Sequence, residues 1–245
     1  MKNKNHLLIL IPARSGSKRV KNKNMKFLKR TPLLGRKIKS CLKSKIGNIV
    51  VSTDSKKIAK YAKKLGAKVP FLRSKKYSSS RASTLSCVLH LLRFYIKKKI
   101  VLPKYIGILP ATNPFLKSNT IKAAYRKLLK NKKFNSILSF TNSSEHPFLI
   151  IKNTNKEKIN FNIVKYNGSR YSDFERTQDW PPVIMCSAAL KLTKTSYFLK
   201  FIKNTSPFIN QKTFDMKSCL GIKITNKESF DINNLDDFKI ANSIA

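Results

Sequence analysis

A cationic loop follows a short apolar run near the start of the printed sequence. Residues 8–11 are apolar, Pro12 ends the run, and Gly16 is the one glycine of the loop. The five cations of the loop are Arg14, Lys18, Arg19, Lys21 and Lys23. A glycine permits a tight backbone turn, and the hydroxyl and amide groups of Ser15 and Ser17 can donate hydrogen bonds to phosphate oxygens that the cations neutralise. This combination predicts an anion-binding loop, and a solvated basic turn is the alternative.

Two familiar phosphate-binding motifs are absent from this loop. The dinucleotide fingerprint G-x-G-x-x-G and the P-loop G-x-x-x-x-G-K-[ST] each need a second glycine that the loop lacks. The loop therefore does not predict a dinucleotide-binding protein or a P-loop nucleotide hydrolase.

Acidic residues are scarce, so each carboxylate is a candidate for chemistry. The chain has 11 Asp and Glu residues against 52 Lys and Arg residues, and only Asp54 and Glu145 lie in the first 150 positions. Asp54 follows an apolar run, where it either caps a helix that begins near Ser55 or contacts a ligand. Near the end of the chain, Asp236 and Asp237 suit the first turn of a helix, where the macrodipole favours acids.

The formal net charge of +41 is far from neutral. Such a charge suits a polyanion such as nucleic acid, because Lys and Arg neutralise phosphates. The cations are spread along the whole chain, however, and no RNP, zinc-finger or homeodomain motif is present. We therefore favour a solvated lysine-rich surface and expect no specific nucleic-acid partner.

Cysteine spacing and hydropathy argue against two further classes. The four cysteines are widely separated and lack the spacing of metal ligands, which favours buried, reduced thiols. No apolar run approaches the length of a membrane span, and no cleavable leader pattern is present. The sequence predicts a soluble, cytoplasmic protein with no membrane partner.

Apolar periodicity predicts an α/β fold. Short apolar runs indicate strands, and apolar residues that recur every three or four positions indicate helices. Strands are expected at 6–11, 49–52, 67–72, 105–110, 136–140, 188–192 and 220–224, and helices at 33–42, 58–65, 85–95, 118–130 and from about 234. The alternation of strand and helix through residue 140 predicts right-handed crossovers and a mostly parallel sheet with flanking helices.

Residues 141–186 interrupt this alternation. Asn, Lys, Ser and Pro accumulate there, and the apolar segments around 148–151 and 159–166 are short. We expect an excursion that carries a hairpin, within a single domain that spans 1–245.

Four polar loops are expected at one edge of the sheet. They are residues 12–24, 53–55, 110–116 and the segment after Ile224. In an open parallel sheet, ligands bind at the carboxyl ends of the strands. The candidate site therefore lies where these loops meet.

The loop sequence IPARSGSKRVKNKN resembles the N-terminal signature of the acylneuraminate cytidylyltransferase family, a strand followed by A-R-x-G-S-K-x-[ILV]-P-x-K-N. The resemblance continues in order through VSTD, RASTLSCVLH, PATNPFL, EHPF, RTQDWPPV and SFDINNLDDF, and it covers essentially the whole chain. It implies a Rossmann-like sheet and an enzyme that activates a nonulosonic acid, a nine-carbon sugar acid, with CTP to give the CMP-sugar and pyrophosphate. It also implies Mg²⁺ as cofactor and a homodimer in which residues 141–186 reach the partner's sugar site.

The resemblance implies roles for individual residues. The catalytic residues would be Arg14, Lys23 and Asp231. Nucleotide contacts would come from Ala13, Ser15, Gly16, Ser17, Lys18, Asn24, Asp54 and Ser83. Substrate contacts would come from Thr112, Asn113, Gln178 and Ser187, and the Mg²⁺ ligands would be Asp231 and Asn233.

Several residues depart from the family pattern. Asn233 stands where a second Asp is usual, which predicts weaker Mg²⁺ binding. Ser187 and Ala188 replace the Asn-Gly pair that normally helps to hold the sugar. The segment PATNPF resembles the pseudaminic branch of the family, whereas RTQDWPPV resembles the sialic and legionaminic branches. The sequence therefore does not identify which sugar acid is the substrate. Three alternatives remain: an enzyme for another sugar acid such as 3-deoxy-manno-octulosonate, a weakened homologue and, less favoured, a polyanion-binding protein.

Overall fold

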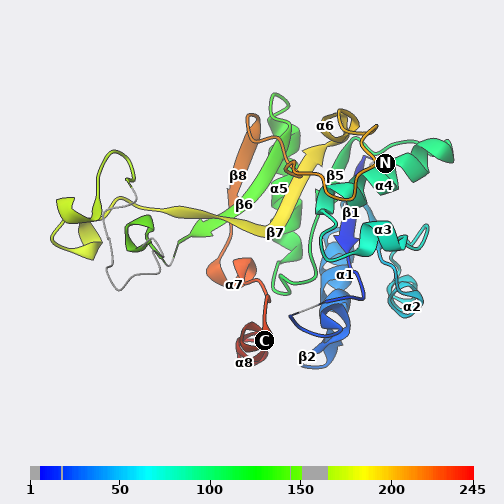
Figure 1. Cartoon of the computed structure of the whole chain (residues 1–245), viewed down its shortest axis with the longest axis horizontal. Helices are drawn as coiled ribbons and strands as arrows, with labels where there is room; N and C mark the ends of the chain where they lie inside the picture. Colours follow the sequence, from blue (N-terminus) through cyan, green and yellow to red (C-terminus); the bar gives the residue numbers. More distant parts are fainter. Residues whose placement is uncertain (1–5, 18, 144, 151–164) are drawn as a thin grey trace.

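The computed structural model describes residues 6–17, 19–143, 145–150 and 165–245. Its centre is a six-stranded sheet with the strand order β4-β1-β5-β7-β6-β8 (Figure 1). The strands are β1 (Leu7–Pro12), β4 (Asn48–Ser52), β5 (Tyr105–Ile108), β6 (Ser136–Asn142), β7 (Ile184–Lys194) and β8 (Cys219–Lys223). All neighbouring strands are parallel except where β7 pairs with β5 and β6. The predicted α/β fold with a mostly parallel sheet is confirmed.

Helices cover both faces of the sheet. The longer helices are α1 (Leu33–Ser44), α2 (Lys56–Lys64), α4 (Thr84–Lys97), α5 (Ser118–Lys130) and α8 (Leu235–Ser243), and the short ones are α3 (Lys75–Ser78), α6 (Thr195–Leu199) and α7 (Asn226–Ser229). Residues of α1, α2 and α5 share one core with Leu7, Ile9 and Ile11 of β1. Residues of α4 and α6 share a second core with Leu8 and Leu10. Strand β1 is therefore buried on both faces, as its uninterrupted apolar sequence predicts.

Short elements complete the connections. They are the two-stranded hairpin of β2 (Phe27–Leu28) and β3 (Thr31–Pro32), and the 3-10 helices η1 (Lys23–Met25), η2 (Pro147–Leu149), η3 (Tyr171–Asp173) and η4 (Thr177–Asp179). The hairpin connects the opening loop to α1 in the chain. Both η1, at the end of the loop, and β3 contact α1.

One predicted strand, at 67–72, is wrong. This segment makes only isolated parallel bridges to β4 and the residue after it, one between Val50 and Lys68 and one between Thr53 and Leu72. Pro70 lies between the two bridges and has no amide hydrogen to donate to a continuous ladder. The strand predicted at 188–192 does form, within β7, but it runs antiparallel to its neighbours.

A long arm leaves the sheet between β6 and β7. Asn142 pairs with Ile184, so the chain leaves and returns at the same point. The arm, of which the structure describes residues 143, 145–150 and 165–183, extends away from the body in Figure 1. Of the predicted hairpin, the described part shows one antiparallel bridge between Tyr166 and Ser169. The apolar segment predicted around 159–166 lies mostly outside the described residues.

The arm has its own aromatic cluster. Phe148 is fully buried, and the ring centroid of His146 lies 4.3 Å from that of Phe148 and 4.9 Å from that of Trp180. The Nε2 atom of His146 lies 3.0 Å from the carbonyl oxygen of Pro181, which joins the outgoing and returning limbs of the arm.

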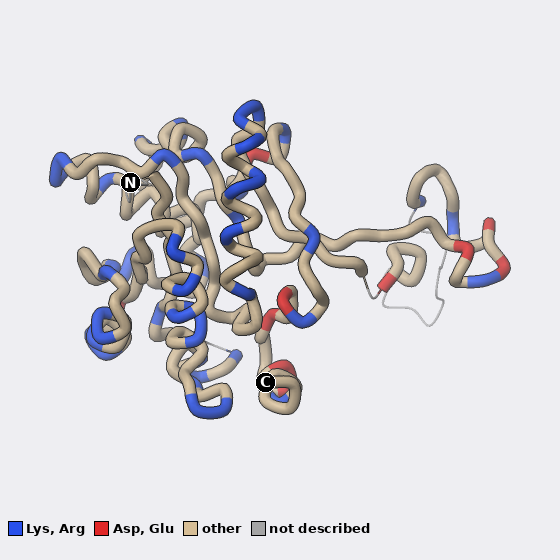
Figure 2. The backbone as a smooth tube through the Cα atoms, turned by 180° about the vertical axis from the view of Figure 1, so that it is seen from behind, with Lys and Arg blue, Asp and Glu red and all other residues tan. Residues whose placement is uncertain are grey.

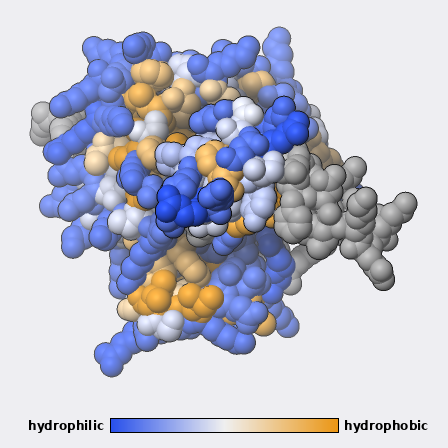
Figure 3. All heavy atoms as spheres, turned by 90° about the vertical axis from the view of Figure 1, so that its left-hand side faces the viewer, coloured by the Kyte–Doolittle hydropathy of each residue, from blue (hydrophilic) through white to orange (hydrophobic). Residues whose placement is uncertain are grey.

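Lys and Arg positions are spread over the body, and several of the Asp and Glu positions lie on the arm or near the C-terminus (Figure 2). The face drawn in Figure 3 is mostly hydrophilic, with small apolar patches between charged residues. In the part of the chain that the structure describes, no helix has the length and hydropathy needed to cross a membrane.

Candidate functional site

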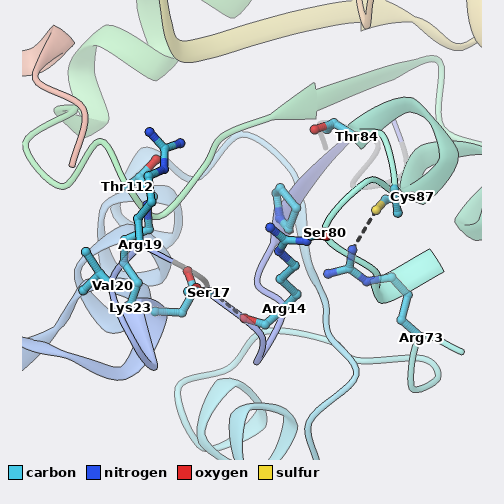
Figure 4. A pocket seen from close by; sticks show the side chains of 13 residues that line it. Arg14, Ser17, Arg19, Val20, Lys23, Arg73, Ser80, Thr84, Cys87 and Thr112 are labelled. Carbon is cyan, nitrogen blue, oxygen red and sulfur yellow. Dashed lines mark hydrogen bonds between the residues drawn. The ribbon is translucent and has the colours of Figure 1, made fainter. Parts of the chain in front are cut away.

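A pocket of about 440 Å³ lies at the carboxyl end of β1, and Thr112 of the loop after β5 also lines it. Its lining includes four cationic residues, Arg14, Arg19, Lys23 and Arg73. In Figure 4 the opening loop forms one wall, and Thr84 and Cys87 at the start of α4 lie on another. The position is the one expected for ligand binding in an open parallel sheet.

The opening loop is held by side chains from outside and inside the loop. Asp54, just beyond β4, accepts hydrogen bonds from the amide of Ser15 at 2.8 Å and from its hydroxyl at 2.7 Å. The buried Asn24 amide donates to the carbonyl oxygen of Arg14 at 2.9 Å. Asp54 therefore does not cap α2, since Ser55 does so by accepting from the Ile58 amide. Asp54 and Asn24 therefore stabilise the conformation of the opening loop.

Gly16 is not required by the protein's own packing. A Cβ atom built at Gly16 would meet no atom within 4 Å, and the backbone there is not in the left-handed region. The predicted tight turn is present, because the amide of Ser17 donates to the carbonyl oxygen of Ser15 at 3.0 Å across Gly16. The open space beside Gly16 leaves the backbone there accessible to a ligand.

Asp54→Asn should loosen the opening loop. Burial opposes ionisation of Asp54, but the hydrogen bonds from Ser15 outweigh burial, and the pKa of the carboxyl is lowered. The stabilisation is therefore complete above the ordinary value of 3.8 and is lost as the pH falls through the lower folded-state pKa. Urea unfolding at pH 7 should give a lower midpoint for the variant, and the difference from wild type should shrink below about pH 4.

The control for this test is Asp236→Asn, which makes the same change at an exposed ion pair with Lys239. An Asp54→Asn difference that is the same at pH 3 and pH 7 would contradict the pairing of Asp54 with Ser15.

The cationic side chains are anchored at defined atoms. Arg14 donates to the carbonyl oxygen of Ser79 at 2.6 Å, and Lys23 donates to the carbonyl oxygen of Ile232 at 2.8 Å. Burial lowers the pKa of Lys23, an effect that the nearby carboxylate of Asp231 opposes. These contacts hold two cations of the loop at the pocket before any ligand binds.

Arg73 is a pocket residue that the sequence analysis missed. It is buried, donates to the carbonyl oxygen of Ser52 at 2.7 Å and contacts the Cys87 sulfur at 2.8 Å (Figure 4). No motif surrounds it, and the only signal is its place directly after the short apolar run 67–72. Arg19, which the sequence does not separate from solvated cations, also lines the pocket.

The segment that carries Asp231 lies beside the opening loop. The Ile232 amide donates to the carbonyl oxygen of Thr112 at 2.9 Å, and Lys23 binds the Ile232 carbonyl oxygen. The Asn113 amide donates to the carbonyl oxygens of Ser229 and Phe230 at 3.0 and 3.2 Å. Thr112 thus lines the pocket, whereas the fully buried Asn113 supports the Asp231 segment from behind.

Asp231 and Asn233 present hard oxygen atoms. The Asn233 amide nitrogen lies 3.3 Å from Oδ2 of Asp231, and the buried Oδ1 of Asp231 has no hydrogen-bond partner among the described residues. Asn234, not Asn233, caps α8 in a reciprocal pair with Asp237. No cluster of three or more His, Cys, Asp or Glu side chains suited to a metal occurs in the described ranges. One carboxylate fits Mg²⁺, which keeps waters and takes its other ligands from substrate phosphates.

Three predicted site residues, Ser83, Gln178 and Ser187, do not line the pocket. The hydroxyl of Ser83 caps α4 by accepting from the Ser86 amide at 3.1 Å. The hydroxyl of the buried Ser187 accepts from the Ala189 amide at 3.2 Å, near the base of the arm. Gln178 lies on η4 in the arm, which extends away from the central sheet in Figure 1. Lys18 lies outside the described residues.

Of the remaining predicted residues, the structure brings several to one place. Arg14, Ser17, Lys23, Asn24 and Thr112 all line the pocket. Ala13 is fully buried beside it, where its amide donates to the carbonyl oxygen of Ser52 at 2.9 Å.

Comparison with known proteins identifies the family. Residues 8–217 match the family model described as cytidylyltransferase. The chain belongs to this family. The relationship predicted from the opening loop and the later motifs is thereby confirmed.

This cytidylyltransferase-family chain is similar to two curated relatives. It is 37% identical over 125 residues to pseudaminic acid cytidylyltransferase of Campylobacter jejuni. It is 40% identical over 119 residues to CMP-N,N'-diacetyllegionaminic acid synthase of Legionella pneumophila. The alignments cover 51% and 48% of this chain and 53% and 51% of the relatives, so the chain spans about half the length of these relatives.

A solved structure shares the fold. It is CMP:2-keto-3-deoxy-manno-octonic acid synthetase complexed with CTP, which matches with a TM-score of 0.69 at 9% identity and covers 97% of both chains. At this identity the likeness shows the architecture alone.

Proposed function

We propose that the protein transfers the CMP group of CTP to a nonulosonic acid and releases pyrophosphate. One observation carries the proposal: the opening loop holds Arg14 and Lys23 at a pocket beside the Asp231 segment. The family match, together with two relatives that are named for pseudaminic and legionaminic acids, supports the choice of CTP and of a nine-carbon sugar acid.

The proposed reaction breaks one bond and forms one. A hydroxyl oxygen of the sugar attacks the α-phosphorus of CTP, the bond to the bridging oxygen of the β-phosphate breaks, and the hydroxyl proton passes to solvent. Negative charge moves onto the leaving pyrophosphate, so fixed cations at Arg14 and Lys23 stabilise the transition state more than the bound substrate. Asp54 and Asn24 contribute by fixing the loop before the reaction, which avoids reorganisation during it.

Mg²⁺ is part of the proposal. Asp231 and Asn233 would hold the ion, which supplies positive charge to the phosphate oxygens. The neutral Asn233 and the single free carboxylate oxygen support a weak site that is completed by the nucleotide.

We further propose a homodimer in which the arm of one copy approaches the pocket of the other. The arm and its base expose apolar side chains, including Leu149 at 48%, Ile150 at 56% and Ile184 at 61% of their surface. Exposed apolar groups of this kind suit a protein contact. The arrangement would bring Gln178 to a partner's sugar and would explain its distance from the pocket of its own chain. Use of CTP would place the protein in the cytoplasm.

Pyrophosphate release tests the proposed function. Purified protein with CTP and Mg²⁺ should release pyrophosphate with pseudaminic, legionaminic or N-acetylneuraminic acid and not without a sugar acid. The other nucleoside triphosphates and 3-deoxy-manno-octulosonate serve as comparisons in the same assay. Pyrophosphate release with 3-deoxy-manno-octulosonate as the one effective sugar acid, or without any sugar acid, would exclude a nonulosonic acid as the substrate.

A further inference from the structure

Glu228 is a buried acid in a chain that has few acids. Its side chain is 4% exposed, and it lies on the short helix α7, three positions before Asp231. The reaction proposed above does not use it, and it forms no salt bridge with another described residue. A buried carboxylate costs free energy unless hydrogen bonds satisfy it. Its donors therefore show which parts of the protein it holds together.

Glu228 joins α7 to the start of α5. Its Oε1 atom accepts from the Lys117 amide at 3.0 Å and from the hydroxyl of Thr120 at 2.5 Å. Lys117 is the N-cap of α5, so both donors lie at the end of that helix where the macrodipole favours an acid. The hydroxyl of Thr225, the N-cap of α7, lies 3.3 Å from Oε2.

Asn113 joins the same two segments with its donor on the other side. It lies in the loop between β5 and α5, and its side-chain amide donates to the carbonyl oxygens of Ser229 and Phe230 at 3.0 and 3.2 Å. The Ile232 amide donates to the loop residue before Asn113 at 2.9 Å. The backbone is thus held on both sides of Asp231 by one loop and the helix that follows it.

The Asp231 side chain has little to hold it besides this backbone. Its Oδ1 atom is buried and has no hydrogen-bond partner among the described residues, and its Oδ2 atom lies 3.3 Å from the Asn233 amide nitrogen. The position of the carboxylate therefore depends on where the backbone places it.

We propose that Glu228 and Asn113, here called the clamp, are positioning residues that fix the carboxylate of Asp231 beside the pocket before a metal ion binds. Neither clamp residue lines that pocket, so each acts through Asp231. A ligand that is fixed in advance loses less conformational freedom on binding, so the clamp should strengthen metal binding. The metal role rests on the proposed function, whereas the clamp is testable in the protein without ligands.

Four variants separate positioning from other roles. Glu228→Ala removes the acceptor, and Thr120→Val removes one donor with little change of shape. Glu228→Gln removes the charge and keeps an oxygen that can accept from Lys117 and Thr120. Asp215→Asn is the control, because Asp215 also accepts a side-chain hydrogen bond, from Asn135 at 2.9 Å, but does so next to the amino end of β6.

Hydrogen exchange tests the clamp without CTP or metal. Amides of residues 229–233 should exchange at least about tenfold faster in Glu228→Ala and in Asn113→Ala, and faster to a smaller extent in Thr120→Val. Glu228→Gln and Asp215→Asn should match the wild type there, and slow exchange in β1 shows that each variant is folded. Wild-type exchange of residues 229–233 in Glu228→Ala, or in Thr120→Val if the alanine variants unfold, would overturn the clamp.

Metal binding tests what the clamp does. With a CTP analogue that cannot release pyrophosphate, the Mn²⁺ concentration for half-saturation, measured by electron paramagnetic resonance, should rise at least about fivefold in Glu228→Ala and less than about twofold in Glu228→Gln and Asp215→Asn. In an Asp231→Asn background, Glu228→Ala should have no further effect, because it acts through that carboxylate.

A rise in Glu228→Gln as large as that in Glu228→Ala would show that Glu228 acts by its charge, and would overturn the positioning role. A wild-type protein that binds no Mn²⁺ with the analogue would overturn the proposed function and the metal role together, and the exchange result would still decide whether the clamp exists.

Discussion

Replacing Lys23 by alanine should lower kcat/KM by about a hundredfold, the usual effect of removing one fixed donor to developing transition-state charge. Lys23 is held at the pocket by its bond to the carbonyl oxygen of Ile232, so the variant loses both a cation and a link between the opening loop and the Asp231 segment. Arg14→Ala removes a second cation, and we expect a loss of at least about tenfold. Steady-state kinetics with varied CTP measures both effects.

Lys21→Ala is the matched control, because Lys21 is an exposed cation of the same loop and does not line the pocket. It should keep wild-type kinetics, and all three variants should unfold near the wild-type temperature. Burial lowers the pKa of Lys23, so this side chain loses its charge as the pH rises before the ordinary lysine value of 10.5 is reached. The wild-type rate should therefore begin to fall with rising pH below 10.5. Wild-type turnover in both Lys23→Ala and Arg14→Ala would show that the opening loop is a solvated basic turn without a role in the reaction.

Asp231→Asn should nearly abolish activity, with a loss of at least about a hundredfold, because it removes the carboxylate of the proposed Mg²⁺ site. Asn233→Asp should act in the opposite direction and lower the Mg²⁺ concentration needed for half-maximal rate, since a charged oxygen replaces a neutral one. It also places a second negative charge beside Asp231 and removes a donor to Oδ2, so the metal-free protein should become less stable. Magnesium titrations of rate and of unfolding temperature check both expectations.

Asn234→Asp is the control for Asn233→Asp. It adds the same charge one residue along, at the N-cap of α8, where aspartate caps as well as asparagine. Its Mg²⁺ dependence should equal that of the wild type. If Asn233→Asp and Asn234→Asp shift the metal dependence equally, the effect is one of general charge and position 233 does not bind the ion.

The sequence predicted the elements better than their directions. Helix α5 spans the predicted range 118–130 because its apolar residues recur at helical spacing, and β1 follows from its unbroken apolar run. The reversed direction of β7 could not be predicted, because a short apolar run carries no information about the neighbour it will pair with.

The site was predictable where a motif lies within one loop and not where contacts join distant segments. Ser15 and Asp54 are 39 positions apart, so the sequence showed a candidate ligand contact where the structure shows a support for the loop. The burial of Lys37 in the middle of α1 could not be predicted, because nothing in the sequence separates it from the rest of the 52 basic residues, most of which suit a solvated surface.

The position of β7 has a consequence for the order of folding during synthesis. In the described sheet, β7 alone joins the β4-β1-β5 half to the β6-β8 half, and it follows the arm in the chain. Until residue 194 has left the ribosome, β5 has an unpaired edge that cannot be closed by the strand made next, β6. The first half of the protein is thus exposed to wrong strand pairing while the whole arm is translated. Slow translation of the arm should increase aggregation of the nascent chain, and slow translation after β7 should not.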